Sequence, residues 1–256
     1  MKIALVTGAS SGLGREFVHQ LAVRKDVDEF WIIARHRDQL EQLAREVPIP
    51  CRIVPLDLCD SSAFDSLEKL LKQEKPEIHW LICSAGSGMI GTISSMDRQQ
   101  VDRMIELNVR ALADVTALAL PYCAKGTGII EIGSVAGFQP MPSFGVYGAT
   151  KAFVESYTKA LHHELLFSGI RVTCACPYWV KDTGFIPLAR KTETSARYVH
   201  PFLTSSSVSV VRLSLLANQF HLWVATPGII TTLQRFFAWI IPDWIVVPFM
   251  ELISRI

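Results

Sequence analysis

The sequence predicts an α/β protein built on a single doubly wound parallel sheet of about seven strands, with helices on both faces. Three observations support this fold class. Short apolar runs alternate with helical patterns, the first run leads directly into a glycine-rich turn, and half of the 256 residues are hydrophobic. A buried parallel strand reads as a continuous apolar run, because both of its faces are covered. At 28.5 kDa the chain is long enough to bury a substantial core.

The expected elements follow one another in order. Short apolar runs predict strands at residues 2–6, 30–34, 52–56, 78–83, 128–132 and 170–175. Helical patterns are expected at residues 12–24 after the glycine turn, at 38–46, at 61–73 behind serine caps, at 97–123 and at 147–167. Beyond Pro177 the alternation loosens, and the last expected elements are a loop-and-helix lid at 183–200, a helix at 208–217 and a seventh strand at 221–226. Because no repeat or linker interrupts this order, we expect one domain over residues 1–256.

Composition excludes several classes of function. A formal net charge of +1 gives no broad attraction to nucleic acid. Six cysteines lack zinc-ligand spacing, so no metal site is expected, and Cys174 and Cys176 are interpreted as buried thiols on one face of a strand. The first apolar run is too short for the core of a signal peptide, which favours a reducing cytoplasm.

A glycine-rich turn joins the first strand to the first helix. Its glycines allow a tight turn and close approach of the backbone to a bound group, and the helix N-terminus behind it offers free N–H donors to a pyrophosphate. The spacing is Gly-x3-Gly-x-Gly rather than Gly-x-Gly-x-x-Gly. The residues expected to hold the phosphates are Gly8, Ser10, Ser11, Gly12, Leu13 and Gly14. This placement predicts a Rossmann-type, dinucleotide-binding sheet, whereas a purely structural turn is the alternative.

The end of the second expected strand indicates which dinucleotide is bound. An acid that would hold the ribose 2′-hydroxyl of NAD belongs there. This chain instead has Ala34, and the basic residues Arg35 and Arg37 follow it closely. Arginine suits the 2′-phosphate of NADP(H), so NADP(H) is favoured over NAD(H), with a solvated basic loop as the alternative. Asp57, with Leu58 beside it, ends the third strand and is expected to meet the adenine edge.

Tyr147 and Lys151 are four residues apart on an expected helix, so their side chains share one face. A free tyrosine has a pKa of about 10 and exchanges protons poorly near neutrality. A fixed cation nearby favours the phenolate and lowers that pKa toward the working range. Alone, the spacing also fits one packed ring and one solvated amine. The other motifs of the chain distinguish the two interpretations.

Over residues 1–183 the chain resembles the short-chain dehydrogenase/reductase family. The resemblance rests on ordered motifs, namely Thr7-Gly8-x3-Gly12-x-Gly14, Asp57, Ala85-Gly86, Asn108, Ser134 and Tyr147-x3-Lys151. It implies a cofactor-binding and catalytic core over 1–183, and a substrate lid, last strand and apolar tail over 184–256. It also implies further cofactor contacts at Ser84, Ala85, Gly86, Asn108, Pro177, Val180 and Thr183, besides Tyr147 and Lys151.

The resemblance also implies a separate role for each catalytic residue. Tyr147 would be the general acid in carbonyl reduction and the base in alcohol oxidation. Lys151 would lower the pKa of Tyr147 and bind the nicotinamide ribose, and Ser134 would hold the substrate oxygen. Asn108 would bend the fourth helix and hold a water in a proton relay to the lysine.

Two positions depart from the family pattern. The usual Asn-Ala-Gly after the fourth strand is Ser84-Ala85-Gly86, so a hydroxyl replaces an inter-strand amide hydrogen bond. The glycine after Pro177 is Tyr178, which puts a ring beside the expected nicotinamide. Tyr178 or Trp179 would then line the substrate pocket, together with Phe185.

The C-terminal third predicts the kind of substrate. It is rich in large apolar side chains, namely Phe185, Ile186, Leu188, Phe202, Phe236, Trp239 and Trp244. A pocket built from them favours a bulky hydrophobic ketone or alcohol, such as an acyl-chain or steroid-like carbonyl. The apolar runs at 236–241 and 244–250 are too short to span a bilayer. They fit core or a subunit interface best, then a pocket wall, then contact with a membrane surface.

The resulting hypothesis is an NADP(H)-dependent oxidoreductase that interconverts a ketone and a secondary alcohol by hydride transfer. The alternative is a catalytically silent NADP(H)-binding sensor or scaffold of the same fold. Silent descendants usually lose the tyrosine or the lysine, and this chain keeps both. The family often assembles through its fourth and fifth helices, which implies a homodimer or homotetramer through residues 97–123 and 147–167.

Overall fold

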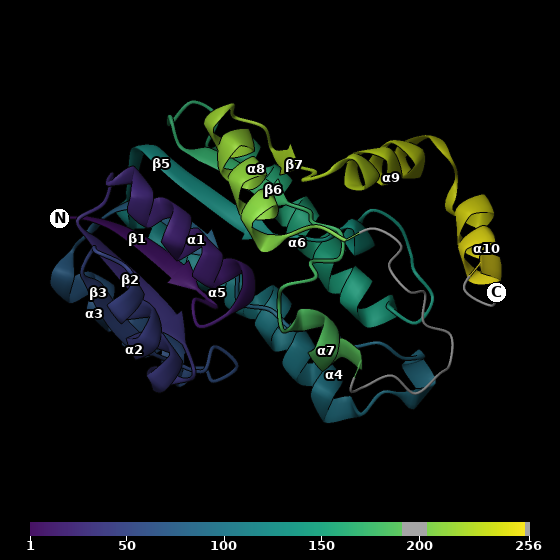
Figure 1. Cartoon of the computed structure of the whole chain (residues 1–256), viewed down its shortest axis with the longest axis horizontal. Coiled ribbons are helices and arrows are strands. Elements are labelled where there is room, and N and C mark those ends of the chain that lie inside the picture. The colour runs from purple at the N-terminus through teal and green to yellow at the C-terminus, as the bar shows by residue number, and fades with distance from the viewer. Residues whose placement is uncertain (191–203, 254–256) are drawn as a thin grey trace.

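The computed structural model describes residues 1–190 and 204–253, and its strands form one parallel sheet (Figure 1). The strands are β1 (Lys2–Thr7), β2 (Glu29–Ala34), β3 (Cys51–Pro55), β4 (Glu77–Cys83), β5 (Cys123–Ile132), β6 (Arg171–Ala175) and β7 (Val224–Ala225). They lie in the order β3-β2-β1-β4-β5-β6-β7. The direction in which successive strands are added reverses between β1 and β4, which defines a doubly wound sheet. The predicted fold class is therefore confirmed.

Helices cover both faces of this sheet. They are α1 (Gly12–Arg24), α2 (Arg37–Glu46), α3 (Ser62–Glu74), α4 (Arg98–Ile105), α5 (Ala111–Ala119), α6 (Gly145–Glu164), α7 (Phe185–Arg190), α8 (Ser207–Gln219), α9 (Ile229–Ile240) and α10 (Asp243–Ile253). One core layer joins the sheet to α3, α5 and α6, and the other joins it to α1, α2 and α8. Alternate residues of β1 serve the two layers, with Ile3 and Leu5 in one and Ala4 and Val6 in the other. Both faces of the strand are buried, which explains its continuous apolar sequence.

The helix expected over residues 97–123 is not continuous. It consists of α4, a π-turn at Glu106–Arg110 and α5, a 3₁₀ turn at Leu120–Tyr122 follows, and β5 already begins at Cys123. The Ala111 N–H bonds to the Glu106 carbonyl, five residues back. This insertion accommodates the buried Asn108, whose amide group bonds outside the helix. The prediction of one regular helix was therefore wrong, although the bend expected at Asn108 is present.

Three smaller expectations also need correction. Ser61 makes no side-chain cap on α3; instead the Asp60 carboxylate accepts from the Ser62 N–H at 3.0 Å. The seventh strand is reduced to Val224–Ala225, because the chain turns at His221 with a positive φ of 56°. The expected lid contributes α7, and the rest of it lies outside the described residues.

The apolar tail does not join the core. In Figure 1, α9 and α10 extend away from the sheet at the C-terminal end of the chain, and α10 is the element farthest from β1. Phe236, Trp239 and Trp244 are exposed. Burial of these rings in the core of the chain is thus excluded. Within residues 1–190 and 204–253, no helix combines the length and the apolar character needed to cross a membrane.

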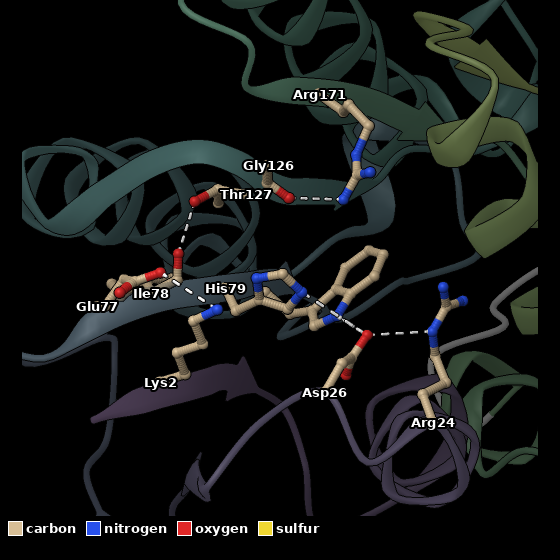
Figure 2. A network of polar contacts seen from close by, with 10 residues as sticks. Lys2, Arg24, Asp26, Glu77, Ile78, His79, Gly126, Thr127 and Arg171 are labelled. Carbon is tan, nitrogen blue, oxygen red and sulfur yellow. Dashed lines mark hydrogen bonds and ion pairs between the residues drawn. The ribbon is translucent and has the colours of Figure 1, made fainter.

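The amino ends of the strands are connected by a polar network (Figure 2). Asp26, in the loop before β2, accepts from the Trp80 indole at 3.2 Å and pairs with Arg24 at 3.3 Å. His79 Nε2 lies 3.7 Å from the same carboxylate. The Arg171 guanidinium at the start of β6 lies 5.5 Å from the centre of the Trp80 ring and donates to the Gly126 carbonyl at 2.7 Å, so the contacts reach from α1 to β6.

Candidate active site

The site lies at the opposite edge, where the carboxyl ends of β1 and β4 meet. A cavity of about 780 Å³ opens there, at the point where the strand order reverses. Its wall contains most of the residues expected at the site, namely Gly8, Ser10, Ser11, Gly12, Leu13, Arg35, Asp57, Leu58, Ser84, Ala85, Gly86, Ser134, Tyr147, Lys151, Pro177, Tyr178, Trp179, Val180, Thr183 and Phe185. The fold thus brings together segments that are far apart in the sequence.

The glycine turn is shaped for close approach. Gly8 and Gly12 have φ angles of +66° and +53°, which side chains rarely adopt. A Cβ at Gly8 would also lie 2.8 Å from the Ala85 amide nitrogen. Ser11 occupies the N-cap of α1 without a side-chain cap, so the first N–H groups of the helix keep their capacity to bind an anion. These features fit the pyrophosphate of a dinucleotide.

Thr7 connects the ends of β1 and β4 beneath this turn. Its Oγ1 accepts from the amides of Ser84 and Ala85, each at 3.1 Å. The Thr7 hydroxyl and two backbone N–H groups therefore make the inter-strand link that we expected from the Ser84 hydroxyl. The departure from the family pattern leaves this part of the turn intact.

Positive and polar side chains gather at one end of the cavity. Arg35, His36, Gln39 and Arg103 all line it there, near Asp57. Burial alone would raise the pKa of Asp57, but the N–H of Cys59 and the guanidinium of Arg103, 3.1 Å away, hold that pKa below its usual range. The carboxylate is therefore charged at neutral pH and is fixed in position by α4. His36 and Arg103 were not among the predicted site residues.

Two glycines bring Ser134 and Tyr147 together. Ser134 opens a 3₁₀ turn at Val135–Gly137, and its Oγ accepts from the Ala136 N–H at 3.2 Å. A Cβ at Gly137 would lie 2.8 Å from the backbone of Lys151, and one at Gly148 would lie 2.8 Å from the Ala136 carbonyl. Only glycine permits α6 to pack this closely on the turn. The Tyr147 phenol then hydrogen-bonds to the Ser134 side chain.

Burial dominates the ionisation of the pair. It raises the pKa of Tyr147 to about 12, although the hydrogen bond to Ser134 acts in the opposite direction. It also lowers the pKa of Lys151 to about 8. The Lys151 ammonium donates to the Ile132 carbonyl at 2.7 Å and lies 5.8 Å from the centre of the Tyr147 ring. Desolvation of the phenol therefore sets the direction of its pKa shift in this structure, and the expected lowering of that pKa by Lys151 stays a prediction.

Asn108 lies behind the cavity and connects three segments. Its side-chain amide donates to the Ser87 carbonyl at 2.8 Å and to Thr150 Oγ1 at 3.0 Å, and its carbonyl accepts from the Ser87 N–H at 2.9 Å. Thr150 lies on α6 between Tyr147 and Lys151. The π-turn is therefore tied both to the loop after β4 and to the helix that carries the Tyr–Lys pair.

Aromatic rings surround the other end of the cavity. The Tyr147 ring lies 5.5 Å from that of Phe185 and 6.3 Å from that of Phe144, measured between centres. Phe144 in turn lies 5.7 Å from Trp179. Phe185 rests directly on Gly88, where any Cβ would collide with its ring. Apolar rings therefore enclose the space in front of the phenol.

Some predicted residues do not reach the cavity wall. Gly14 packs against the Gly8 carbonyl, Arg37 opens α2, and Asn108 lies one layer deeper. Of the apolar candidates in the C-terminal third, Phe185 and Leu188 line the cavity, whereas Ile186, Phe236, Trp239 and Trp244 do not. Phe202 lies outside the described residues. Sequence reasoning missed other wall residues, namely His36, Gln39, Gly88, Arg103, Met141, Phe144 and Gln234. No local pattern marks Arg103, because its position in the wall goes with its ion pair to Asp57.

Comparison with known proteins agrees with this geometry. The family model described as short chain dehydrogenase matches residues 2–194. The chain belongs to the short-chain dehydrogenase/reductase family. Such a protein is an oxidoreductase that works on small molecules with a nicotinamide cofactor. The doubly wound sheet and the glycine turn agree with membership of this family.

Three similar proteins illustrate the range of the family. A sulfoacetaldehyde reductase of Chromohalobacter salexigens is 34% identical over 189 residues, which cover 70% of this chain and 72% of the relative. A short-chain dehydrogenase from Sphingobium yanoikuyae, solved in complex with NADPH, has a TM-score of 0.78 at 26% identity, covering 100% of this chain and 96% of that one. A bulky-bulky ketone specific alcohol dehydrogenase from Comamonas testosteroni has a TM-score of 0.73 at 25% identity, covering 95% and 96%.

Proposed function

We propose that the protein is an NADP(H)-dependent oxidoreductase that interconverts a bulky hydrophobic ketone and a secondary alcohol. The observation that carries the proposal is the hydrogen-bonded pair of Ser134 and Tyr147 in the cavity wall, with Lys151 beside it and aromatic rings in front of it. A bound nicotinamide supplies the hydride for reduction and accepts it for oxidation.

Tyr147 and Ser134 handle the substrate oxygen in this proposal. Because the pKa of Tyr147 is raised to about 12, its phenol is protonated at neutral pH, which is the form that reduction requires. The Ser134 hydroxyl holds the carbonyl oxygen as negative charge develops on it. Tyr147 then passes its proton to that oxygen. The buried Lys151 ammonium supplies positive charge near the phenolate that remains, and Asn108 orients this helix through Thr150.

The basic end of the cavity supports the choice of NADP(H). Arg35 follows β2 in the place where an acid would favour NAD, and Arg103 and His36 add donors to the same end. Asp57 would hold the adenine edge, and Gly8 to Leu13 the pyrophosphate. The Sphingobium relative was solved with NADPH, which supports this choice by analogy.

The aromatic end supports a bulky apolar substrate. Phe144, Trp179 and Phe185 present ring faces to a substrate. Burial of apolar substrate area against these rings would stabilise the bound complex. The Comamonas relative is named for bulky ketones, which agrees with this interpretation. The Chromohalobacter relative is named for sulfoacetaldehyde, a small anionic aldehyde, and provides the opposite case for a test.

The test is NADPH oxidation with a panel that runs from aryl and alicyclic ketones to sulfoacetaldehyde, using wild type and Tyr147→Phe. We expect turnover with bulky ketones that falls about 10²–10⁴-fold in the variant. Equal turnover by the two proteins would refute the catalytic assignment and favour a silent cofactor-binding protein. Turnover of the sulfonate alone would refute the substrate class.

Arg35→Ala tests the cofactor assignment separately. Loss of a charge-assisted hydrogen bond of about 1.5–3 kcal/mol should raise the KM for NADPH roughly 10–100-fold. The KM for NADH should stay within about twofold. Arg37→Ala is the matched control, because Arg37 does not line the cavity, and it should leave both KM values unchanged. An unchanged preference in Arg35→Ala would contradict the 2′-phosphate assignment.

A further inference from the structure

Helix α9 is amphipathic, but its polar side faces the protein. Thr231 is fully buried, and Gln234 lies in the cavity wall. The Arg235 guanidinium stacks on two rings of the body, 5.1 Å from the centre of Trp223 and 6.0 Å from that of Phe138. The apolar side of α9 points to solvent. A surface helix of a globular protein normally has the reverse orientation.

The outward residues are evenly spaced along α9. They are Ile229, Leu233, Phe236 and Ile240, with Phe237 beside them, and each is about half exposed or more. Successive steps of four, three and four residues are the spacing of a seam between two packed helices. At the start of α10, Trp244 is 76% exposed and Ile245 continues the surface, while Trp239 at 83% lies on the adjoining flank of α9. We call these eight residues the α9 face.

The α9 face is too large for a free surface. At roughly 200 Å² for a large apolar side chain, the exposed fractions sum to an area on the order of 1,000 Å². The largest apolar patch of an ordinary monomer is about 300–600 Å². A standard protein–protein interface buries about 800 Å² on each partner, so the α9 face meets what a stable dimer needs.

The charges favour a protein partner over a lipid surface. A helix that lies on a membrane carries lysine and arginine on its polar side, where they meet anionic headgroups. The single cation of α9, Arg235, is directed at Trp223 and Phe138 instead. The α10 sequence contains two acids and no base. Depletion of charge together with enrichment in Trp and Phe is typical of the core of a protein interface.

We propose that a second copy of this chain covers the α9 face, with the α9 helices of the two copies packed on each other about a twofold axis. In such an interface the same residues meet from both sides, which a regularly spaced apolar seam allows. Because Gln234 of the same helix lines the cavity, assembly also holds α9 against the aromatic end of the site. That last consequence rests on the proposed function, whereas the interface does not.

Light scattering of the full chain tests the interface. We compare wild type with the double variant Leu233→Ser/Phe236→Ser, and use Val23→Ser as the matched control, because Val23 is an exposed apolar residue outside the α9 face and outside residues 97–123 and 147–167. We expect a wild-type particle of two or more chains of 28.5 kDa whose mass halves in the double variant and stays unchanged in the control. A single-chain wild type, or a double variant that keeps its full mass, overturns the proposal. A wild type that stays single-chained and co-floats with phosphatidylglycerol vesicles overturns it in favour of a lipid surface.

Hydrogen exchange of wild type provides a second measurement that needs no substitution. Amides of α9 should exchange more slowly at high protein concentration than at low concentration, and those of α1 should not change. Equal exchange of α9 at both concentrations overturns the interface. The link to the site is measured apart from it, as an increase of at least twofold in the KM for ketone in the double variant; a halved mass with an unchanged KM refutes only that link.

Discussion

The two edges of the sheet differ in the partners of their charged side chains. At the amino edge, one carboxylate, Asp26, contacts an arginine from α1 and an indole and a histidine from β4 (Figure 2). At the carboxyl edge, Lys151 is buried with a backbone carbonyl as its hydrogen-bond partner, and the phenol of Tyr147 is buried beside a hydroxyl. The Asp26 carboxylate at the amino edge is paired with an opposite charge, whereas the buried Lys151 cation at the carboxyl edge is held by a carbonyl oxygen.

This difference separates stability from chemistry. A buried cation without a carboxylate is destabilising, whereas a shared carboxylate contributes stability. The same uncompensated cation is what a developing phenolate can use. Substitutions at the amino edge should therefore lower the stability of the fold and leave turnover unchanged. Substitutions at the carboxyl edge should lower turnover without lowering stability. Substitutions at each edge can contradict this division.

Lys151→Met should have the largest effect. We expect turnover to fall by about 10²–10⁴-fold, because the cation near Tyr147 is lost. The free energy of unfolding at pH 7 should rise by about 1–2 kcal/mol, because the charged form of Lys151 destabilises the fold. This follows from its pKa of about 8 in the folded protein, below the ordinary 10.5. The stability of wild type should accordingly increase as pH rises from 8 to 10.5. Urea titration and NADPH oxidation measure the two effects.

Lys72→Met is the control for that substitution. Lys72 is exposed on α3, where it pairs with Glu68 at the surface, and its loss should change stability by less than about 1 kcal/mol and leave turnover intact. A Lys151→Met protein that is both inactive and strongly destabilised would show that the carboxyl edge also supports the fold.

Glu131 should make stability depend on pH. This fully buried residue of β5 accepts from Thr116 and Thr158, and burial raises its pKa to about 7 from 4.5. Its contribution is therefore complete below pH 4.5 and is lost as pH rises to 7. Relative to Glu131→Gln, wild type should lose about 2–3 kcal/mol over this window. Urea titrations of both proteins at several pH values measure the difference, and parallel curves would contradict it.

Asp26→Ala should weaken folding without affecting turnover. It removes the acceptor of the Trp80 indole and the partner of Arg24, which should lower the free energy of unfolding by about 1–3 kcal/mol. We expect kcat and KM to stay within about twofold, because the amino edge lies at the other end of the sheet from the cavity. Asp65→Ala, at an exposed carboxylate of α3, is the control and should change stability by less than about 0.5 kcal/mol. Reduced kcat in Asp26→Ala would break the comparison.

Gly88→Ala should have the smallest effect, and this effect should be limited to the binding of the ketone substrate. Its methyl group would displace Phe185 from its place beside Tyr147. A loss of about 1 kcal/mol in substrate binding raises the KM for ketone roughly fivefold, with the KM for NADPH unchanged. Gly145→Ala is the control, because a Cβ there makes only ordinary contact with Ile93, at 3.4 Å, and Gly145 does not line the cavity. Equal KM values in both variants would show that Phe185 does not contact substrate.

Local sequence predicted the parts of this molecule that depend on local rules. Continuous apolar runs predicted the buried strands, and α1 has the bounds expected from its glycine turn. The spacing of Tyr147 and Lys151 on one helix placed both in the cavity wall. These features depend on periodicity and backbone geometry, which a few neighbouring residues determine.

The errors concern properties that depend on distant partners. Asn108 breaks its helix because Ser87 and Thr150, remote in sequence, take up its amide group. The pKa of Tyr147 follows from burial, which no spacing reveals. The tail has a clear apolar stripe, but its sequence does not say which side faces the body. Arg103 was missed because its importance depends on Asp57, which lies in the loop after β3, far from Arg103 in the sequence.

The π-turn has a consequence for how the two halves of its helix can vary. One additional residue in a helical turn rotates everything before it by about 100° relative to everything after it. Here that offset lets α5 keep its apolar side on the core while α4 directs Arg103 at Asp57. Deletion of Val109, a residue of the π-turn that does not line the cavity, would restore an uninterrupted helix and turn Arg103 away from the cavity without removing any lining side chain. At this point the number of residues in the turn, rather than their chemical character, determines where the Arg103 side chain points.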